Sequence, residues 1–248
     1  IAVDAIFPDS KAAGEATLEQ LQAGKGAFEA YAKALDLKTA NATTPRGPEL
    51  INATTNGYDP SVATFANSKA IFLKQGNWAY NGYVSANSEI GDTLTFLPIK
   101  LGATDDEILS GLTQEQINTS IPVFVPLYWA INAKCDEEEK EKAEAFLAWL
   151  YQTDEGIDFV KNQMSMIPWN ADPNEVSAGY SLGDSILSYM AEGKTITNAY
   201  AGAPAGWAQY TLGQYLMENY VNKAEWPDDA YSDIADYLIS SWEEAAGL

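Results

Sequence analysis

The spacing of apolar residues changes along this chain, and the change limits the folds that the chain can form. In the first half, apolar residues gather in short runs rich in β-branched and aromatic side chains, at 70–73, 93–99 and 122–131. Such runs are typical of strands, and the prolines in two of them indicate strand ends or edge strands. In the second half, apolar residues recur every three or four positions, which is typical of helices. The sequence therefore predicts an α/β or α+β fold, with about five strands and about seven helices.

Several helices can be placed by their apolar stripes and their start signals. A stripe of four apolar residues predicts a helix over 25–37, and Asp59-Pro60-Ser61 predicts a helix start that leads to a short helix ending near Asn67. The acidic run 136–139 suits a helix N-terminus, and an apolar stripe containing Phe146 follows it. Two further helices are predicted by Leu212, Leu216 and Tyr220, and by Ile234, Leu238 and Trp242.

Charge and composition exclude several classes of function. The chain has 35 Asp and Glu residues against 14 Lys and Arg, a net charge of −21, so phosphate backbones and anionic lipid surfaces are repelled. We therefore expect no nucleic acid or membrane-surface partner. The chain has no His, which removes Ser/His and Cys/His nucleophile pairs and His-ligated zinc. Any catalysis would have to use carboxylates, Lys or Tyr, and we expect no cofactor and no metal.

The single thiol, the longest apolar stretch and the start of the sequence add further expectations. Cys135 has no second cysteine with which to form an internal disulfide, and we expect a small buried residue there. The longest nearly apolar stretch, 121–131, is far shorter than the ~20 residues that span a bilayer. Because the sequence opens on Ile1 without a basic segment or a cleavage site, we expect any signal peptide to lie upstream of it.

Two partial sequence motifs lack residues that a catalytic or a nucleotide-binding site requires. Glu192-Gly193-Lys194-Thr195 has the end of a phosphate-binding loop, but Ser188 stands where the first Gly is needed. Gly183-Asp184-Ser185 begins like a nucleophile elbow, but Leu187 replaces the second Gly and no His can deprotonate the Ser. With 35 carboxylates, closeness in sequence cannot nominate the acid and base of a glycosidase.

Aromatic residues, 12% of the chain, stand in unusual places. Trp78 follows a Gly turn, Tyr128 and Trp129 end a predicted strand, and Trp207 follows a loop at 203–206. A sugar ring has an apolar face edged by hydroxyls, so it is bound by a flat aromatic surface with amides or carboxylates at the rim. These positions therefore indicate carbohydrate stacking, and ordinary packing is the alternative for each of them.

The order of several short segments resembles the second half of extracellular solute-binding proteins of ABC importers, family 1, of the sugar and maltodextrin type. The segments are 65–72, 75–78, 96–99, 129–133, 143–150 with 153–156, and 166–168. Pro204-Ala205-Gly206-Trp207 and the last two predicted helices also fit that family's C-terminal region.

The resemblance implies a periplasmic-binding-protein-like type II fold, with two α/β lobes, a hinge and a ligand cleft. It implies that residues 1–129 and 178–248 belong to the C-terminal lobe and that 130–177 contributes to the N-terminal lobe and the hinge. Most of that second lobe normally precedes position 1, so the chain looks like a fragment or a cleavage product. The family further implies a monomer at the extracellular face of the membrane or in the periplasm, with a lipid anchor outside this chain, that delivers a carbohydrate to a membrane permease.

The resemblance also implies which residues contact the ligand. Trp78 is similar to the aromatic residue after the Gly turn that stacks on sugar, and Trp207 is similar to the stacking residue of the C-terminal region. Tyr128 and Trp129 lie at the expected hinge, and Tyr80 and Asn81 are further expected contacts.

Two other functions remain open at this point. A carboxylate-based carbohydrate-active enzyme would explain the aromatic residues and the acidity equally well. A binding protein of the same shape for another solute, such as a peptide or polyamine, is the second alternative.

Overall fold

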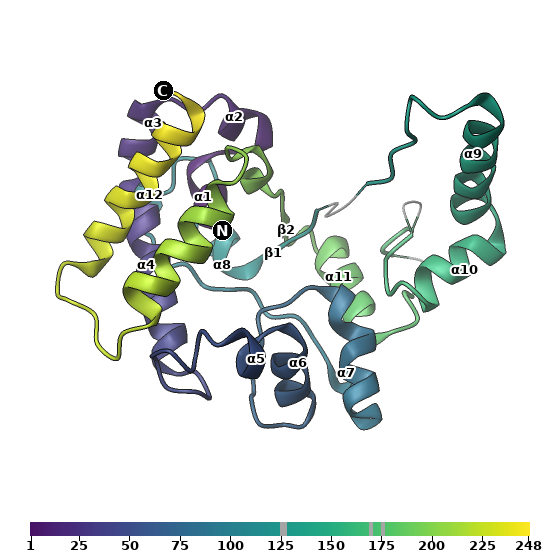
Figure 1. Cartoon of the computed structure of the whole chain (residues 1–248), viewed down its shortest axis with the longest axis horizontal. Helices are drawn as coiled ribbons and strands as arrows, with labels where there is room; N and C mark the ends of the chain where they lie inside the picture. The colour runs from purple at the N-terminus through teal and green to yellow at the C-terminus, as the bar shows by residue number, and fades with distance from the viewer. Residues whose placement is uncertain (125–127, 169–170, 175–176) are drawn as a thin grey trace. The chain divides into compact units, whose positions relative to one another are not determined.

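The computed structural model of the chain describes residues 1–124, 128–168, 171–174 and 177–248, with the backbone alone at 210–212. It is a mixed but helix-rich fold, 58% helical, with one small parallel sheet among the described residues. The chain divides into two compact units (Figure 1). Unit 1 comprises residues 1–61, 97–123 and 194–248, and unit 2 comprises residues 62–96 and 124–193.

Unit 1 is built mainly from helices. They are α1 (Ala2–Ile6), α2 (Ser10–Gly14), α3 (Leu18–Ala23), α4 (Lys25–Ala40), α5 (Ala53–Asn56), the 3-10 turns η3 (Asp105–Glu107) and η4 (Ala199–Gly202), α8 (Gln114–Thr119), the π-helical segments η5 (Trp207–Tyr215) and η6 (Met217–Val221), and α12 (Ala230–Ala246). The predicted helices over 25–37 and around Ile234, Leu238 and Trp242 are confirmed as α4 and α12. The stretch marked by Leu216 and Tyr220 is helical too, but with π geometry.

The sheet of unit 1 consists of β1 (Ile121–Pro122) and β2 (Thr195–Ile196), which pair in parallel with Ile121 opposite Thr195. The amide of Ile121 donates to the carbonyl of Lys194 at 3.1 Å, and the amide of Val123 donates to Ile196 at 3.2 Å. Pro122 lies between these donors, where the pairing requires no N–H from it.

The core of unit 1 is closed by aromatic residues from helices far apart in sequence. Trp207 and Trp242 meet edge to face with ring centroids 4.7 Å apart, and the indole N–H of Trp207 donates to the carbonyl of Leu238 and to Ser241 Oγ, at 3.2 and 3.0 Å. Phe28 of α4 packs on Trp207 at 6.4 Å. The C-terminal helix is thereby held against η5 and α4.

A buried charge lies at the edge of the same unit. The guanidinium of Arg46, the only Arg in the chain, pairs with the carboxylate of Asp36, and Tyr231 donates to the same carboxylate. This hydrogen bond raises the pKa of the Tyr231 hydroxyl above its ordinary value, with smaller contributions from burial and from the charge of Asp36. Arg46 also lies over the ring of Trp226, 4.9 Å from its centroid. These contacts join α4, the loop after it and α12.

Unit 2 has its own core and its own helices. Its elements are most of α6 (Tyr58–Ala66), η1 (Asn77–Ala79), α7 (Tyr80–Ala86), η2 (Ser88–Thr93), α9 (Glu137–Gln152), α10 (Asp154–Asn162) and α11 (Ser181–Ala191). The predicted helix after Asp59 is confirmed as α6, and the predicted helix after the acidic run is confirmed as α9. Asp136 caps α9, and its carboxylate accepts from the amide of Glu139 at 2.8 Å.

The strand predictions at 70–73 and 93–99 are wrong, since neither segment is a strand. Residues 70–75 run without regular structure and leave the side chains of Ile71 and Phe72 exposed. A strand needs a neighbour to pair its N–H and C=O groups, and residue preference alone does not supply one. Within 122–131 the only described strand residue is Pro122, the second residue of β1, and 125–127 lie outside the described residues.

We predict that Trp207→Ala lowers the free energy of unfolding by about 3–5 kcal/mol, because it leaves a cavity beside Trp242. A urea titration followed by circular dichroism measures the change. Tyr128→Ala is the matched control, because this side chain is 89% exposed, and it leaves the midpoint unchanged. A Trp207→Ala midpoint equal to that of the control would contradict this packing.

We predict that Asp36→Asn destabilises the chain by about 2–3 kcal/mol, since the charged partner of Arg46 is lost. The pKa of Tyr231 should also fall toward its ordinary value of 10.0. A raised tyrosine pKa stabilises the folded chain at pH below 10 and ceases to do so as pH rises through the folded value. Urea titrations at pH 7 and at alkaline pH check both effects, and the loss of stability on raising the pH should be smaller in the variant.

Candidate functional site

The turn that carries Trp78 is fixed by the residue before it. The side-chain amide of Asn77 donates to the carbonyl of Ser165 at 2.7 Å and to the hydroxyl of Tyr180 at 3.2 Å. The Tyr180 hydroxyl donates in turn to the same Ser165 carbonyl, at 2.5 Å, and burial raises its pKa. Thus η1 is tied both to the loop at 165 and to the residue that precedes α11.

Trp78 itself presents part of its indole to solvent. The side chain is 41% exposed, and its N–H donates to the side-chain oxygen of Gln75 at 2.9 Å. The ring lies over Gly76, where a Cβ would fall only 2.3 Å from a ring carbon, so a larger residue there would displace the ring. The indole of Trp78 is therefore held at one edge by the side-chain amide of Gln75. An aromatic ring beside an amide is an arrangement that suits stacking on a sugar.

Tyr80 and Asn81, the next two predicted contacts, serve mainly to hold the unit together. The ring of Tyr80 packs on that of Tyr180 with centroids 4.9 Å apart, and desolvation raises the pKa of its hydroxyl. The amide of Asn81 is exposed and donates to the carbonyl of Gln163 at 3.0 Å. Of the two, Asn81 is the residue with a side chain at the surface.

Tyr128 and Trp129 lie on the surface of unit 2. Tyr128 is 89% exposed and Trp129 is 55% exposed. The indole N–H of Trp129 donates to the hydroxyl of Tyr151 at 2.7 Å, and its ring meets Phe146 edge to face at 6.1 Å. No ring contact among the described residues joins Trp78 to either of them.

Trp207 is placed differently from the other predicted contacts. It is 3% exposed and lies in the core of unit 1, against Trp242 and Phe28. A ligand could stack on this ring only after the core had opened. Trp207 is a packing residue of the core, and its ring is not accessible to a ligand.

The sequence reasoning did not single out the exposed aromatic residues of α9 and α10. Phe146 is in the predicted apolar stripe but is about half exposed, and Trp149 and Phe159 are also exposed. Leu150 of α9 and Val160 of α10 are the buried residues of this helix pair. Phe146 and Trp149 are three residues apart and therefore lie on the same side of the helix. The sequence could thus have predicted a second, aromatic stripe on α9.

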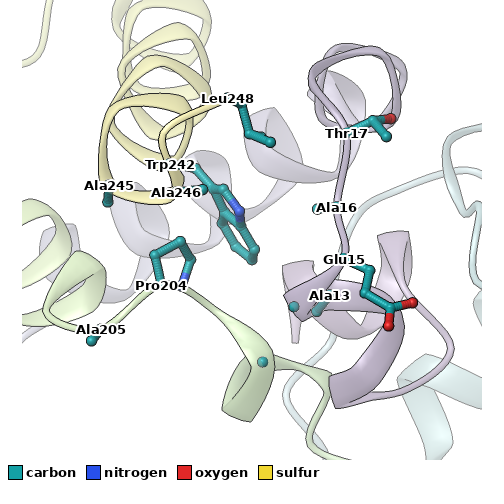
Figure 2. Close-up of a pocket in the computed structure, with 12 residues that line it drawn as sticks. Ala13, Glu15, Ala16, Thr17, Pro204, Ala205, Trp242, Ala245, Ala246 and Leu248 are labelled. Carbon is teal, nitrogen blue, oxygen red and sulfur yellow. The ribbon is translucent and has the colours of Figure 1, made fainter.

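A pocket of about 440 Å³ lies within unit 1, and none of the six predicted contacts lines it. Figure 2 shows the Trp242 indole directed into it, with Pro204 near the ring and the Glu15 carboxylate on the opposite wall. The pocket wall is closely packed at Gly202, where a Cβ would fall 1.8 Å from the carbonyl oxygen of Ser10. The pocket is lined by Ala13, Gly14, Glu15, Ala16, Thr17, Gly202, Pro204, Ala205, Trp242, Ala245, Ala246 and Leu248.

Acidic side chains do not gather into a metal site in the described part of the chain, where no group of three or more carboxylate or thiol side chains could hold a metal ion. Cys135, expected to be buried, is partly exposed, and its thiol donates to the carbonyl of Asn132 at 2.8 Å. Within the described ranges, no helix is both long enough and apolar enough to span a membrane.

Comparison with protein-family models, with curated proteins and with solved structures finds no match to this chain.

We predict that Asn77→Ala loosens the turn that carries Trp78, because two hydrogen bonds to the 165 loop and to Tyr180 are lost. The expected cost is about 1–2 kcal/mol, with faster amide hydrogen exchange at 76–80. Asn67→Ala is the control, since the side-chain amide of Asn67 donates to the carbonyl of Ala63, four residues earlier, at 2.8 Å. Equal exchange rates at 76–80 in the two variants would refute the anchoring role.

Proposed function

We propose that this chain is a substrate-binding component of an ABC importer, which binds a carbohydrate, in particular an oligosaccharide, and performs no catalysis. The observation that carries the proposal is the exposed indole of Trp78, held by Gln75 on an anchored turn. An aromatic face beside an amide suits a sugar ring, whose apolar face stacks while its hydroxyls form hydrogen bonds.

Further support comes from the surface of the same unit. Tyr128 and Trp129 are exposed, and Asn81 has its amide at the surface near the start of α7. A neutral ligand suits a chain of net charge −21, which repels anions. The absence of His removes the commonest acid–base residue, in keeping with binding without turnover.

We infer a type II binding-protein fold with two lobes and a hinge. The division into two compact units supports it, since the chain passes between them four times, after residues 61, 96, 123 and 193. Several chain crossings are expected between two hinged lobes, because a single linker would leave the lobes free to turn independently. The lobe boundaries proposed from the sequence, at 129–130 and 177–178, remain a prediction.

The mechanism of such a receptor is a population shift. A ligand that contacts both lobes favours the closed form, whereas a ligand that binds open and closed forms equally shifts nothing. Micromolar affinity corresponds to about −8 kcal/mol, which is within reach of two or three stacked rings and several hydrogen bonds. The permease would then recognise the closed form.

We predict that Trp78→Ala weakens oligosaccharide affinity by about 2–3 kcal/mol, which is about 30- to 150-fold, with little change in unfolding. Isothermal titration calorimetry with maltodextrins of defined length measures the effect. Trp149→Ala is the matched control, because it removes another exposed Trp of the same unit, and it should bind as the unsubstituted chain does.

Three results would reject parts of this proposal. Unchanged affinity in Trp78→Ala would discard the stacking role of that residue. Release of shorter sugars on incubation, detected by chromatography, would identify a carboxylate-based enzyme. Thermal stabilisation by peptides or polyamines but by no sugar would identify a receptor for another solute.

A further inference from the structure

Four aromatic side chains form a continuous row on the outer side of α9 and α10, which we call the aromatic face: Trp129, Phe146, Trp149 and Phe159. Neighbouring ring centroids along the row are 6.1, 6.0 and 6.3 Å apart. The row therefore joins the segment before α9 to both helices, within unit 2.

The aromatic face is exposed throughout. Its members keep between 37% and 55% of their surface accessible. Because an aromatic side chain buries about 150–250 Å² when covered, the row presents roughly 400 Å² of apolar surface. That area matches the largest patch of a typical soluble monomer, and such patches are often functional.

The rings also pack between the two helices. Leu150 of α9 and Gly156 and Val160 of α10 are the buried residues of the pair, and the ring of Trp149 lies 6.3 Å from that of Phe159. The corner between the helices is set by Gly156, where a Cβ would fall 2.1 Å from the carbonyl oxygen of Trp149. The ring surface that stays exposed after this packing has the composition of the centre of a protein interface, which is enriched in Trp and other aromatic residues.

The helix pair that carries the aromatic face is acidic. Residues 136–162 contain nine carboxylates and three lysines, a net charge of −6. Two of the lysines, Lys140 and Lys142, pair with Glu137 and Glu138 at 2.5 Å on the same helix. On α10, Glu155 is exposed one turn before Phe159, on the same side. A partner that covers the rings therefore meets a helix pair of net negative charge.

Geometry and charge together select the kind of partner. A second copy of this chain would bring an equally acidic helix pair against this one, which opposes association. A carbohydrate that stacks along the whole row is disfavoured because the four rings do not form one flat platform: successive planes are turned by 80°, 30° and 51°. We propose that the aromatic face docks a polypeptide segment with an apolar stripe bordered by Lys and Arg side chains. This proposal does not depend on the proposed transport function.

A synthetic amphipathic helix of Leu and Lys, with Leu at positions i, i+3, i+4 and i+7, is the probe. Binding to the full chain is measured by fluorescence anisotropy, beside a scrambled Leu/Lys peptide of the same composition. We expect the amphipathic peptide to bind more tightly than the scrambled one, with affinity that falls as salt is added. In Phe146→Ser with Trp149→Ser, we expect affinity to fall by about tenfold or more.

Ile71→Ser with Phe72→Ser is the matched control, since these side chains are 83% and 74% exposed in the same unit. It should bind the peptide as the unsubstituted chain does. If the first double variant loses its circular dichroism signal, Phe159→Ser on α10 replaces it and should weaken binding in the same direction.

Equal affinity for the two peptides, or equal losses in the face variant and the control, would overturn the proposal in favour of binding by net charge alone. Unchanged affinity in a folded face variant would also overturn it. Self-association in analytical ultracentrifugation that the face variant abolishes would assign the surface to a second copy instead.

Discussion

The contact between the indoles of Trp207 and Trp242 in unit 1 holds together helices that are far apart in sequence. Trp207 of η5 and Trp242 of α12 meet at 4.7 Å, and Phe28 of α4 and Phe7 after α1 add their rings at 6.4 and 6.0 Å. Aromatic side chains bury more area than other residues, so four of them supply much of the packing in a unit with one two-stranded sheet. The pocket beside Trp242 exists because this cluster fixes its wall.

The helices were predictable because their signals are local. The cap at Asp136 and the stripe of Ile234, Leu238 and Trp242 need only neighbours three or four residues away. The strands were not predictable, because pairing is decided by chain that is distant in sequence. At 70–75 the residue types favour a strand, yet no described segment pairs with it, whereas β1 forms because Ile121 meets Lys194 and Thr195.

The candidate site shows the same limit. A tryptophan after a glycine turn is exposed at Trp78, and a tryptophan after a glycine-containing loop is buried at Trp207, although their local sequences indicated the same role. Exposure depends on what packs against the ring: Gln75 and Gly76 cover one side of Trp78, whereas α4 and α12 pack against Trp207. The sequence identifies candidate stacking residues, but only the tertiary structure shows whether a given ring lies at the surface or in the core.

The most direct measurement follows the indole N–H resonances of the full chain by nuclear magnetic resonance while an oligosaccharide is added. We expect the Trp78 resonance to shift in a saturable manner, and the Trp207 and Trp242 resonances to stay in place, because the latter two side chains are only 3% and 1% exposed. A saturable shift confined to Trp207 and Trp242, or no shift of any indole at millimolar sugar, would contradict the proposal that exposed rings of unit 2 bind the ligand.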